Sequence, residues 1–338
     1  MDATDAAVDA LVGRLLTERV ERDSFTEVRA DDVERWCRSF DEGRVRHDVR
    51  RAGWMAPPEM VTTFLRPPAP PAPGAPAATN VALHERLKEA LGLPVGIATG
   101  YELEALALVG EGDRLVSVER IAEVGPERDT RVGRGRDWVI EVVSSFADGP
   151  SAGARVCVER WRMTGYDPSR AGGSAGTSAS SPPDPAAAGH ALEGIPPMRA
   201  TIVVDRDFIV DAATANRVWA SAHHDDDAAS AAGLPGIIVD TSTWVALAAR
   251  SAAVWLGGDP RVGAVSLSMR RPVVAGDEVE LHGEVLADAV DDHDVRWMTV
   301  GVTALVRGRT VAVADVRLAV ATADGADVWS LAGERWQP

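Results

Sequence analysis

The sequence has few cysteines, no excess of basic residues and no long apolar run. Only Cys37 and Cys157 occur in the 338 residues. They are too few and too far apart for a disulfide framework or a thiolate metal site. Both are therefore expected to be reduced thiols in a core, and no redox chemistry is implied.

Acidic residues outnumber basic ones. The 35 Lys and Arg residues face 51 Asp and Glu residues, which gives a formal net charge of −16. A surface of that sign repels phosphate groups, so a nucleic-acid partner is not expected. The first residues carry acids where a secretory signal would carry bases, and nowhere do ~18 apolar residues run uninterrupted. A cytoplasmic protein without membrane insertion is expected.

Two low-complexity segments divide the chain. Ser, Gly, Ala and Pro predominate between Gly172 and Pro197, which predicts a flexible linker at residues 169–198. A proline-rich run predicts an extended loop at residues 66–80, inserted within a domain. We therefore expect an N-terminal unit at residues 1–168 and a C-terminal unit at residues 199–338.

The two halves follow the same order of elements, which indicates an internal duplication. Each has a turn and an apolar helix, at residues 52–65 and 234–257, followed by runs rich in Val, Ile and aromatic residues that predict strands. A Gly-Asp pair occurs at the matching place in each half, at residues 112–113 and 276–277. This order predicts a duplicated α+β unit in which one long helix packs on an antiparallel sheet.

In this order of elements the sequence resembles the MaoC-like dehydratase and (R)-specific enoyl-CoA hydratase family of the double hot dog type. The N-terminal half resembles its degenerate unit through MAPPEMVTTF, GYELEALALVGEGDRL and IAEVGPERDTRVGRGRDWVI. The C-terminal half resembles its catalytic unit through HHDDDAASAAGLPGIIVDTSTW and LSMRRPVVAGDEVELHGEV. The resemblance implies two tandem hot dog units whose sheets join. It also implies a lyase that acts on 2-enoyl or 3-hydroxyacyl coenzyme A thioesters without a cofactor.

The resemblance also assigns roles to individual residues. The family histidine falls at His223 and the donor at the helix N-terminus falls at Thr241, whose backbone N–H would stabilise an enolate-like thioester oxygen. The family aspartate, five residues before the histidine, falls at Val218. Either another acid substitutes for it, or this half is not a hydratase of the usual kind.

Two acids are candidates for the missing group. Asp225 is close to the histidine in sequence, and Asp240 is expected at the N-cap of the helix. An N-cap Asp usually accepts backbone N–H bonds, which stabilises a helix by about 0.5–2 kcal/mol. The stretch around Asp225 has a structural interpretation of the same kind, in which one of its three aspartates caps a short Ala-rich helix that Gly233 ends.

Four further residues are candidates for substrate contacts: Trp219, Gly236, Trp244 and Arg270. The tryptophans either line a pocket for a bulky ring system or fill core. The guanidinium group of Arg270 suits a coenzyme A phosphate, and an exposed strand arginine is an equal alternative. No metal site is predicted, because His223 and His224 on an extended segment would point to opposite sides.

Two other functions stay open. The valine at position 218 is also consistent with a catalytically degenerate acyl-CoA-binding subunit that works with a partner chain. Hot dog proteins also hydrolyse thioesters, so an acyl-CoA thioesterase is a third interpretation. Besides the acyl-CoA, the expected partner is a second copy of the chain or another hot dog subunit. The sequence does not distinguish fatty acyl from steroid substrates.

Overall fold

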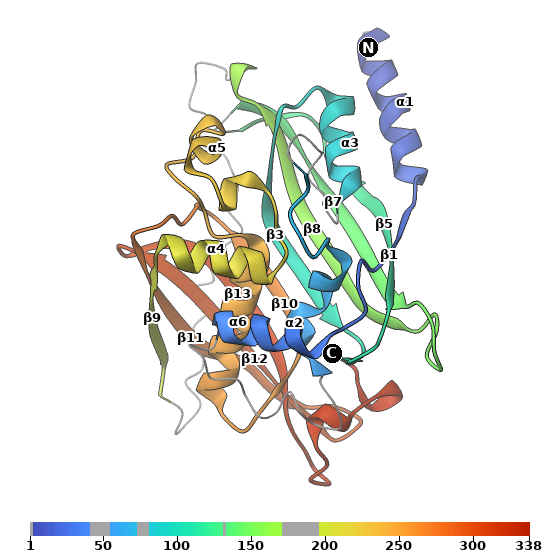
Figure 1. Ribbon diagram of the computed structural model, residues 1–338, viewed down its shortest axis with the longest axis vertical. Helices are drawn as coiled ribbons and strands as arrows, with labels where there is room; N and C mark the ends of the chain where they lie inside the picture. Colours follow the sequence, from blue (N-terminus) through green and yellow to red (C-terminus); the bar gives the residue numbers. More distant parts are fainter. Residues whose placement is uncertain (1–2, 41–54, 73–80, 131–132, 171–195) are drawn as a thin grey trace.

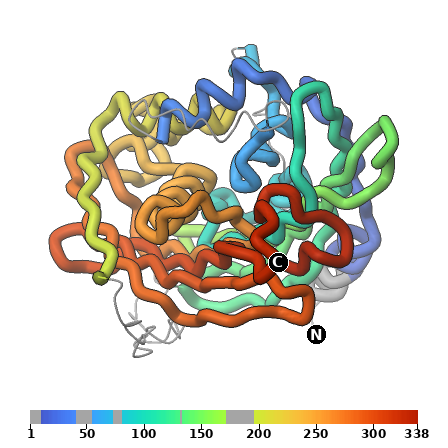
Figure 2. Tube along the Cα trace, turned by 90° about the horizontal axis from the view of Figure 1, so that it is seen from below, coloured from blue at the N-terminus to red at the C-terminus, as the bar shows by residue number. Residues whose placement is uncertain are grey.

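A curved antiparallel sheet with helices inside its curve forms the molecule. The computed structural model describes residues 3–40, 55–72, 81–130, 133–170 and 196–338. Figure 1 shows the two halves of the sheet side by side, and Figure 2 shows the orange helix of the C-terminal half inside the curve. The order of the strands shows how the two sequence repeats form one continuous sheet.

The N-terminal unit supplies one half of the sheet. Its strands lie in the order β1 (Val20–Asp23), β5 (Leu115–Val124), β7 (Gly133–Phe146), β8 (Arg155–Asp167) and β3 (Val95–Ala105). The short strand β6 (Arg128–Thr130) pairs with β7. A separate two-stranded ribbon joins β2 (Met55–Ala56) to β4 (Val109–Gly110).

The C-terminal unit repeats this arrangement in the opposite direction. From the middle of the sheet outwards its strands are β10 (Arg261–Met269), β13 (Arg309–Thr322), β12 (Val295–Val306), β11 (Asp277–Val290) and β9 (Met198–Val204). Strand β10 thus corresponds to β3, β13 to β8, and β12 to β7.

The two halves join through β3 and β10, which pair antiparallel, with Leu103 opposite Val265 and Glu102 opposite Ser266. The result is a single sheet of eleven strands among the described residues. Leu103 and Val265 are both buried, whereas Ser266 is exposed. Hydrophobic residues of both units therefore face one shared core, and the predicted double hot dog architecture is confirmed.

The Gly-Asp turns that marked the duplication have the same structure in both units. Gly112 and Gly276 have positive φ values of 90° and 95°, which glycine adopts without steric cost. The Asp113 carboxylate accepts a hydrogen bond from the Gly110 N–H at 2.7 Å, and the Asp277 carboxylate accepts one from the Val274 N–H at 3.1 Å. These turns therefore identify equivalent residue positions in the two units.

In the C-terminal unit, the long helix α6 (Thr241–Leu256) packs inside the sheet. Its buried face is rich in alanine, including Ala246, Ala249 and Ala252, all with no exposed surface. Small side chains allow a helix to lie close to a sheet, and alanine has the highest helix propensity. The helix ends where Gly257 adopts a φ of 67°.

The prediction of a similar long helix in the N-terminal unit is wrong. There the equivalent segment is η2 (Pro58–Leu65), a 3-10 helix of eight residues. Arg66 already has an extended conformation, with φ −113° and ψ 149°, and two prolines follow it. A proline disfavours helical geometry in the residue before it, so the chain must leave the helix at this point.

The other helices are α1 (Ala3–Thr17), α2 (Ala30–Phe40), α3 (Ala82–Leu91), α4 (Arg206–Ala215) and α5 (Asp226–Ala231), of which α2 and α4 contact α6. Short 3-10 segments are η3 (Pro168–Arg170), η4 (Ser221–His223), η5 (Val328–Ser330) and η6 (Gly333–Arg335). One hydrophobic cluster includes Trp36 and Phe64 of the N-terminal unit together with Ala249 and Val316 of the C-terminal unit. Both units therefore share the core that supports the site described below.

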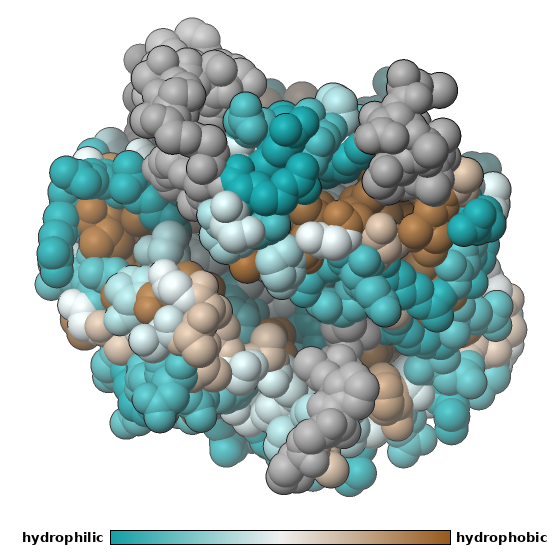
Figure 3. All heavy atoms as spheres, turned by 90° about the horizontal axis from the view of Figure 1, so that it is seen from above, coloured by the Kyte–Doolittle hydropathy of each residue, from teal (hydrophilic) through white to brown (hydrophobic). Residues whose placement is uncertain are grey.

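The division of the chain at residues 1–168, 169–198 and 199–338 stays a prediction. Residues 171–195, most of the predicted linker, lie outside the described residues, as do residues 73–80 of the proline-rich insertion. In the described part, no helix is both long and apolar enough to cross a membrane. The face of the molecule in Figure 3 is mainly hydrophilic, and its apolar residues gather in separate patches.

Candidate active site

The start of α6 is a capped helix N-terminus. Asp240 lies just before it in an extended conformation, with φ −81° and ψ 164°, and only 3% of its surface is exposed. Its carboxylate accepts hydrogen bonds from the backbone N–H of Thr243 at 3.0 Å and from the hydroxyl of Thr243. Asp240 thus occupies the N-cap position, and a catalytic role for it stays a prediction.

Thr241 is the first residue of α6 and is partly exposed. The first N–H groups of a helix have no partner within the helix. In the described part of the chain, no carbonyl or side chain accepts a hydrogen bond from the Thr241 N–H. This N–H therefore lies at the positive end of the helix dipole and can donate to a developing negative charge.

His223 lies beside the segment that leads into α6. Its Nδ1 is 2.8 Å from the carbonyl oxygen of Ile238, which is three residues before Thr241. Because a carbonyl only accepts hydrogen bonds, Nδ1 carries the proton, and Nε2 of the neutral ring is left as an acceptor. The half-buried imidazole thus has the tautomer that a general base needs, close to a helix N-terminus.

The neighbouring histidine has a different position. His224 Nε2 donates to the carbonyl of Val218 at 2.7 Å, and its ring stacks on Trp219 with 5.8 Å between centroids. The indole N–H of Trp219 donates to the carbonyl of Pro67 in the N-terminal unit at 2.8 Å. His224 and Trp219 therefore fix the segment around Val218 rather than presenting a free polar group.

The remaining acidic candidate, Asp225, is the N-cap of α5. Its exposed carboxylate accepts from the Ala228 N–H at 2.9 Å, and Gly233 follows the helix with a φ of 78°. The short Ala-rich helix expected for this stretch is therefore present. No group of metal-ligating side chains is found among the described residues.

The other predicted contact residues lie on different elements. Trp244 is buried and lines a small apolar cavity between α6 and the sheet, together with Ala248, Leu267 and Leu281. Gly236 lies in the turn where the Ile237 N–H donates to Asp226 at 3.3 Å. The Nε and Nη2 atoms of Arg270 are buried. Contacts of these residues with a substrate stay predictions.

The equivalent helix start in the N-terminal unit has different chemistry. Gly110 and Val274 are equivalent, because the N–H of each donates to the aspartate of the Gly-Asp turn three residues later. Their pairing partners, Met55 and Ile238, are therefore equivalent as well. Counting three residues onward aligns Pro58 with Thr241, and each is the first residue of its helix. Proline has no N–H, so the N-terminal unit lacks the donor that Thr241 provides.

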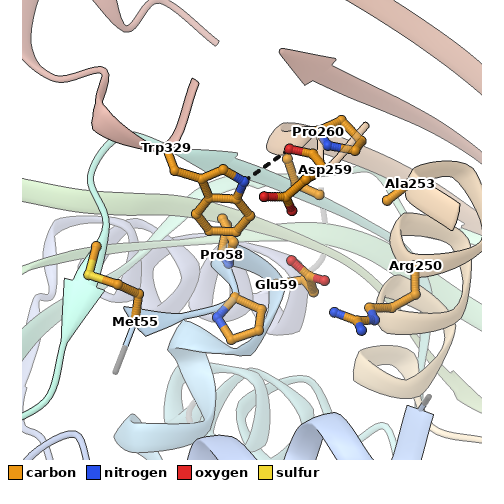
Figure 4. A pocket seen from close by; sticks show the side chains of 10 residues that line it. Met55, Pro58, Glu59, Arg250, Ala253, Asp259, Pro260 and Trp329 are labelled. Carbon is orange, nitrogen blue, oxygen red and sulfur yellow. Dashed lines mark hydrogen bonds between the residues drawn. The ribbon is translucent and has the colours of Figure 1, made fainter. Parts of the chain in front are cut away.

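A pocket lies at this second helix start. Its walls come from both units: Met55, Pro57, Pro58, Glu59, Arg250, Ala253, Asp259, Pro260, Val262 and Trp329. Figure 4 shows the Glu59 and Arg250 side chains directed toward each other, and the Trp329 indole donating to the Asp259 carbonyl at 3.1 Å. The second helix start thus has the carboxylates of Glu59 and Asp259 and the guanidinium group of Arg250 in its pocket, whereas the start of α6 has the Thr241 N–H.

A buried carboxyl group in the sheet of the N-terminal unit was not predicted from the sequence. Glu159 on β8 has no exposed surface, and the Tyr101 hydroxyl donates to it at 2.8 Å. Burial raises its pKa from 4.5 to about 7, against the opposing effects of Arg66, Tyr101 and Trp161. The period of two in β8 places Glu159 on the same face as Cys157 and Trp161, which is a signal that the sequence did contain.

Replacing Glu159 with glutamine should stabilise the protein above pH 7. The folded-state pKa is above the unfolded one, so the carboxyl lowers stability as pH rises from 4.5 to about 7 and has no pH-dependent effect below that range. The unfolding free energy of Glu159→Gln minus that of the wild type should therefore increase by up to ~3 kcal/mol across this range. Urea unfolding at a series of pH values measures this difference. A difference that does not change with pH would show that folding leaves the pKa of Glu159 unchanged, against the rise to about 7.

Comparison with known proteins supports the fold and part of the sequence resemblance. No family model matches the chain. A structure described as a MaoC-like dehydratase superposes with a TM-score of 0.64 at 16% identity, covering 93% of this chain and all of that one. A MaoC-like dehydratase from Phytophthora capsici gives a TM-score of 0.58 at 14% identity, covering 94% and 99% of the two chains. A protein of Mycobacterium tuberculosis described as having a double hotdog fold gives 0.58 at 15% identity, covering 93% and 98%.

The chain thus has the double hot dog fold of MaoC-like dehydratases, as the sequence resemblance implied. A curated relative, the beta subunit of 3-oxo-4,17-pregnadiene-20-carboxyl-CoA hydratase of Mycobacterium tuberculosis, is 36% identical over 83 residues. That match covers 25% of this chain, and the chain spans 64% of the relative's length.

Proposed function

We propose that the protein is an acyl-CoA hydratase or dehydratase, which adds water to a trans-2-enoyl thioester or removes it from a 3-hydroxyacyl thioester. The observation that carries the proposal is the position of the His223 imidazole, which the Ile238 carbonyl, three residues before Thr241, holds with Nε2 as the acceptor, while the Thr241 N–H has no acceptor in the described part of the chain. The fold shared with MaoC-like dehydratases and the match to a hydratase subunit support it.

The chemistry needs one base and one oxyanion donor. His223 Nε2 takes a proton from water while the water oxygen bonds to C3 and the electrons of the C2–C3 double bond move toward the thioester carbonyl. The Thr241 N–H stabilises the enolate oxygen that results. The imidazolium then returns a proton to C2, which completes the addition of water and regenerates the neutral ring. No carboxylate at position 218 is required if a single imidazole transfers both protons.

One site per chain follows from the comparison of the two helix starts. Pro58 cannot donate a hydrogen bond and Glu59 adds a negative charge, whereas the Thr241 N–H has no acceptor among the described residues. We therefore expect one molecule of acyl-CoA to bind per chain. Because η2 is short, we expect the acyl group to lie in the N-terminal unit, in space that a longer helix would fill.

The identity of the product tests the proposal. The purified chain is mixed with trans-2-enoyl-CoA thioesters that range from short-chain to ring-bearing acyl groups, and the products are analysed by mass spectrometry and with a thiol reagent. The expected result is a gain of one water by an intact thioester. Release of free coenzyme A would instead identify a thioesterase, and unchanged substrate would contradict catalysis by the lone chain.

A second candidate function is an acyl-CoA-binding subunit that needs a partner hot dog chain. Val218, in place of the family aspartate, favours it, as does the match to a protein described as a beta subunit. Retained acyl-CoA binding without turnover, together with activity on addition of a partner chain, would support this function. Turnover by the purified chain alone would exclude it.

Restoring the absent acid should increase the hydration rate. A second proton-transferring group contributes up to several orders of magnitude in optimised sites, so we expect Val218→Asp to raise kcat by ~10-fold or more. Val218→Asn is the matched control, because it has the same shape without a basic oxygen pair. Initial rates at saturating enoyl-CoA measure the effect. Equal rates for the two variants would mean that position 218 does not face the reacting atoms.

A further inference from the structure

We infer that Arg66 of the N-terminal unit is a positioning residue for the candidate site of the C-terminal unit, where it holds the segment of Val218 and the first turn of α6 in a fixed relative position. This inference rests on the proposed function, because it concerns the same site. The N-terminal unit would then position residues of the site, in addition to accommodating the acyl group.

The contacts of the Arg66 guanidinium group carry the inference. Arg66 is 4% exposed, and its Nη1 donates to the carbonyl of Asn216 at 2.7 Å. Its Nη2 donates to the hydroxyl of Ser242 at 3.0 Å. Asn216 is two residues before Val218, and Ser242 directly follows Thr241. One planar group thus bridges the segment that leads toward His223 and the helix turn with the oxyanion donor.

Asn216 extends this bridge with its side chain. Its amide nitrogen donates to the Thr243 hydroxyl at 3.2 Å, and its amide oxygen accepts from the Trp36 indole at 2.7 Å. Thr243 in turn binds the N-cap Asp240. Helix α2, the segment after α4 and the first turn of α6 are therefore connected through buried polar groups, each with a partner.

The turn between Asn216 and Val218 has a backbone geometry that needs support. Arg217 has a φ of 53°, which a residue with a side chain seldom adopts. Its guanidinium group donates to Asp32 at 2.8 Å, to Thr26 at 3.0 Å and to the Arg66 carbonyl at 3.4 Å. Contacts from the N-terminal unit thus hold the turn from both sides, as expected where the position of a neighbouring segment matters.

Glu159 explains why the charge of Arg66 is also needed. The carboxyl is fully buried, and the positive charge of Arg66 favours its ionised form. Removing Arg66 alone would therefore leave a buried carboxyl without its counter-charge. A test must separate this charge effect from the positioning effect.

Three variants make this separation. Arg66→Lys keeps the charge and loses the two-armed geometry, Ser242→Ala removes one acceptor, and Arg66→Met combined with Glu159→Gln removes both charges together. The matched control is Arg162→Lys, because Arg162 is an exposed arginine on β8 that pairs with Glu102 at 2.5 Å, away from α6.

Two readouts are measured on each full-length variant: steady-state hydration kinetics, and backbone amide exchange resolved along α6. A misplaced donor of about 1 Å can lower a rate by as much as 100-fold, so we expect kcat of Arg66→Lys and of the double variant to fall ~10-fold or more with a smaller change in KM. Exchange should become faster at Thr243 and Trp244, whose N–H groups donate to Asp240, and stay unchanged in the last turn of α6. Ser242→Ala should show a smaller change in the same direction, and Arg162→Lys should show none.

The opposite results would overturn the inference. Unchanged kcat per folded chain and unchanged exchange in the first turn of α6 would show that Arg66 only stabilises the fold, whatever the melting temperature. If the wild type hydrates no enoyl-CoA, the proposed function fails. The amide-exchange measurement on the unliganded chain still decides whether Arg66 holds this turn.

Discussion

Thr241→Pro should remove most of the hydration activity while leaving the fold intact. The substitution deletes one N–H group at the first position of α6, where proline is accepted because the helix does not use that donor. The preceding residue, Asp240, already has the extended geometry that a following proline requires. Loss of one oxyanion donor lowers kcat by ~100- to 1,000-fold in other enzymes, and we expect a loss of that size.

The protein itself contains the precedent for this variant. The N-terminal unit has Pro58 at the equivalent position, where it is the first residue of the 3-10 helix η2. Thr241→Ala is the matched control, since it removes the hydroxyl group and keeps the N–H. Steady-state rates and the thermal melting temperature are measured for both. If Thr241→Pro folded normally and retained its rate, the oxyanion donor would have to lie elsewhere.

His223→Ala should abolish the proton transfer that the hydration requires. General acid–base groups contribute ~100- to 10,000-fold, and here the same imidazole handles both protons, so we expect a loss near the upper end of that range. The hydrogen bond to the Ile238 carbonyl is lost as well, which should lower stability only modestly because the ring is half-buried. Rates normalised to acyl-CoA occupancy separate the chemical step from binding.

A second histidine provides the control for this experiment. His282 lies on β11 with 35% of its side chain exposed and pairs with Glu280, far in sequence from the α6 start. His282→Ala should therefore keep the wild-type rate. Full activity in His223→Ala would contradict the proposed base and would move attention to Asp240 or Asp225.

The sequence predicts the architecture because short-range features, the Gly-Asp turns and the alternating apolar residues of the strands, recur in both halves. The Gly-Asp turns at residues 112–113 and 276–277 require a positive φ and an aspartate that closes the turn, and both features occur in the structure. The alternating apolar residues of the strands determine which face is buried. The helix expected within residues 52–65 is a 3-10 helix of eight residues, which begins at Pro58 and which the two prolines after Arg66 keep from extending further.

The candidate site is only partly predictable, for a physical reason. His223 and Thr241 are placed by local sequence, because the segment with the short helix α5 returns the chain so that the His223 ring meets the carbonyl three residues before the helix start. Arg66 is 176 residues before Ser242 in sequence, and the two meet only because the two units share one sheet, joined by β3 and β10. Contacts of this kind depend on the joined sheet, so local sequence patterns do not reveal them.

The most direct test of the account is the turnover of trans-2-enoyl-CoA by the purified chain with no other protein present, followed as loss of the enoyl thioester absorbance. The proposed site predicts a rate proportional to the chain concentration, with one acyl-CoA bound per chain and no acceleration by an added hot dog partner. A flat trace from a folded chain that binds acyl-CoA would contradict catalysis by His223 and would identify a subunit that needs a partner.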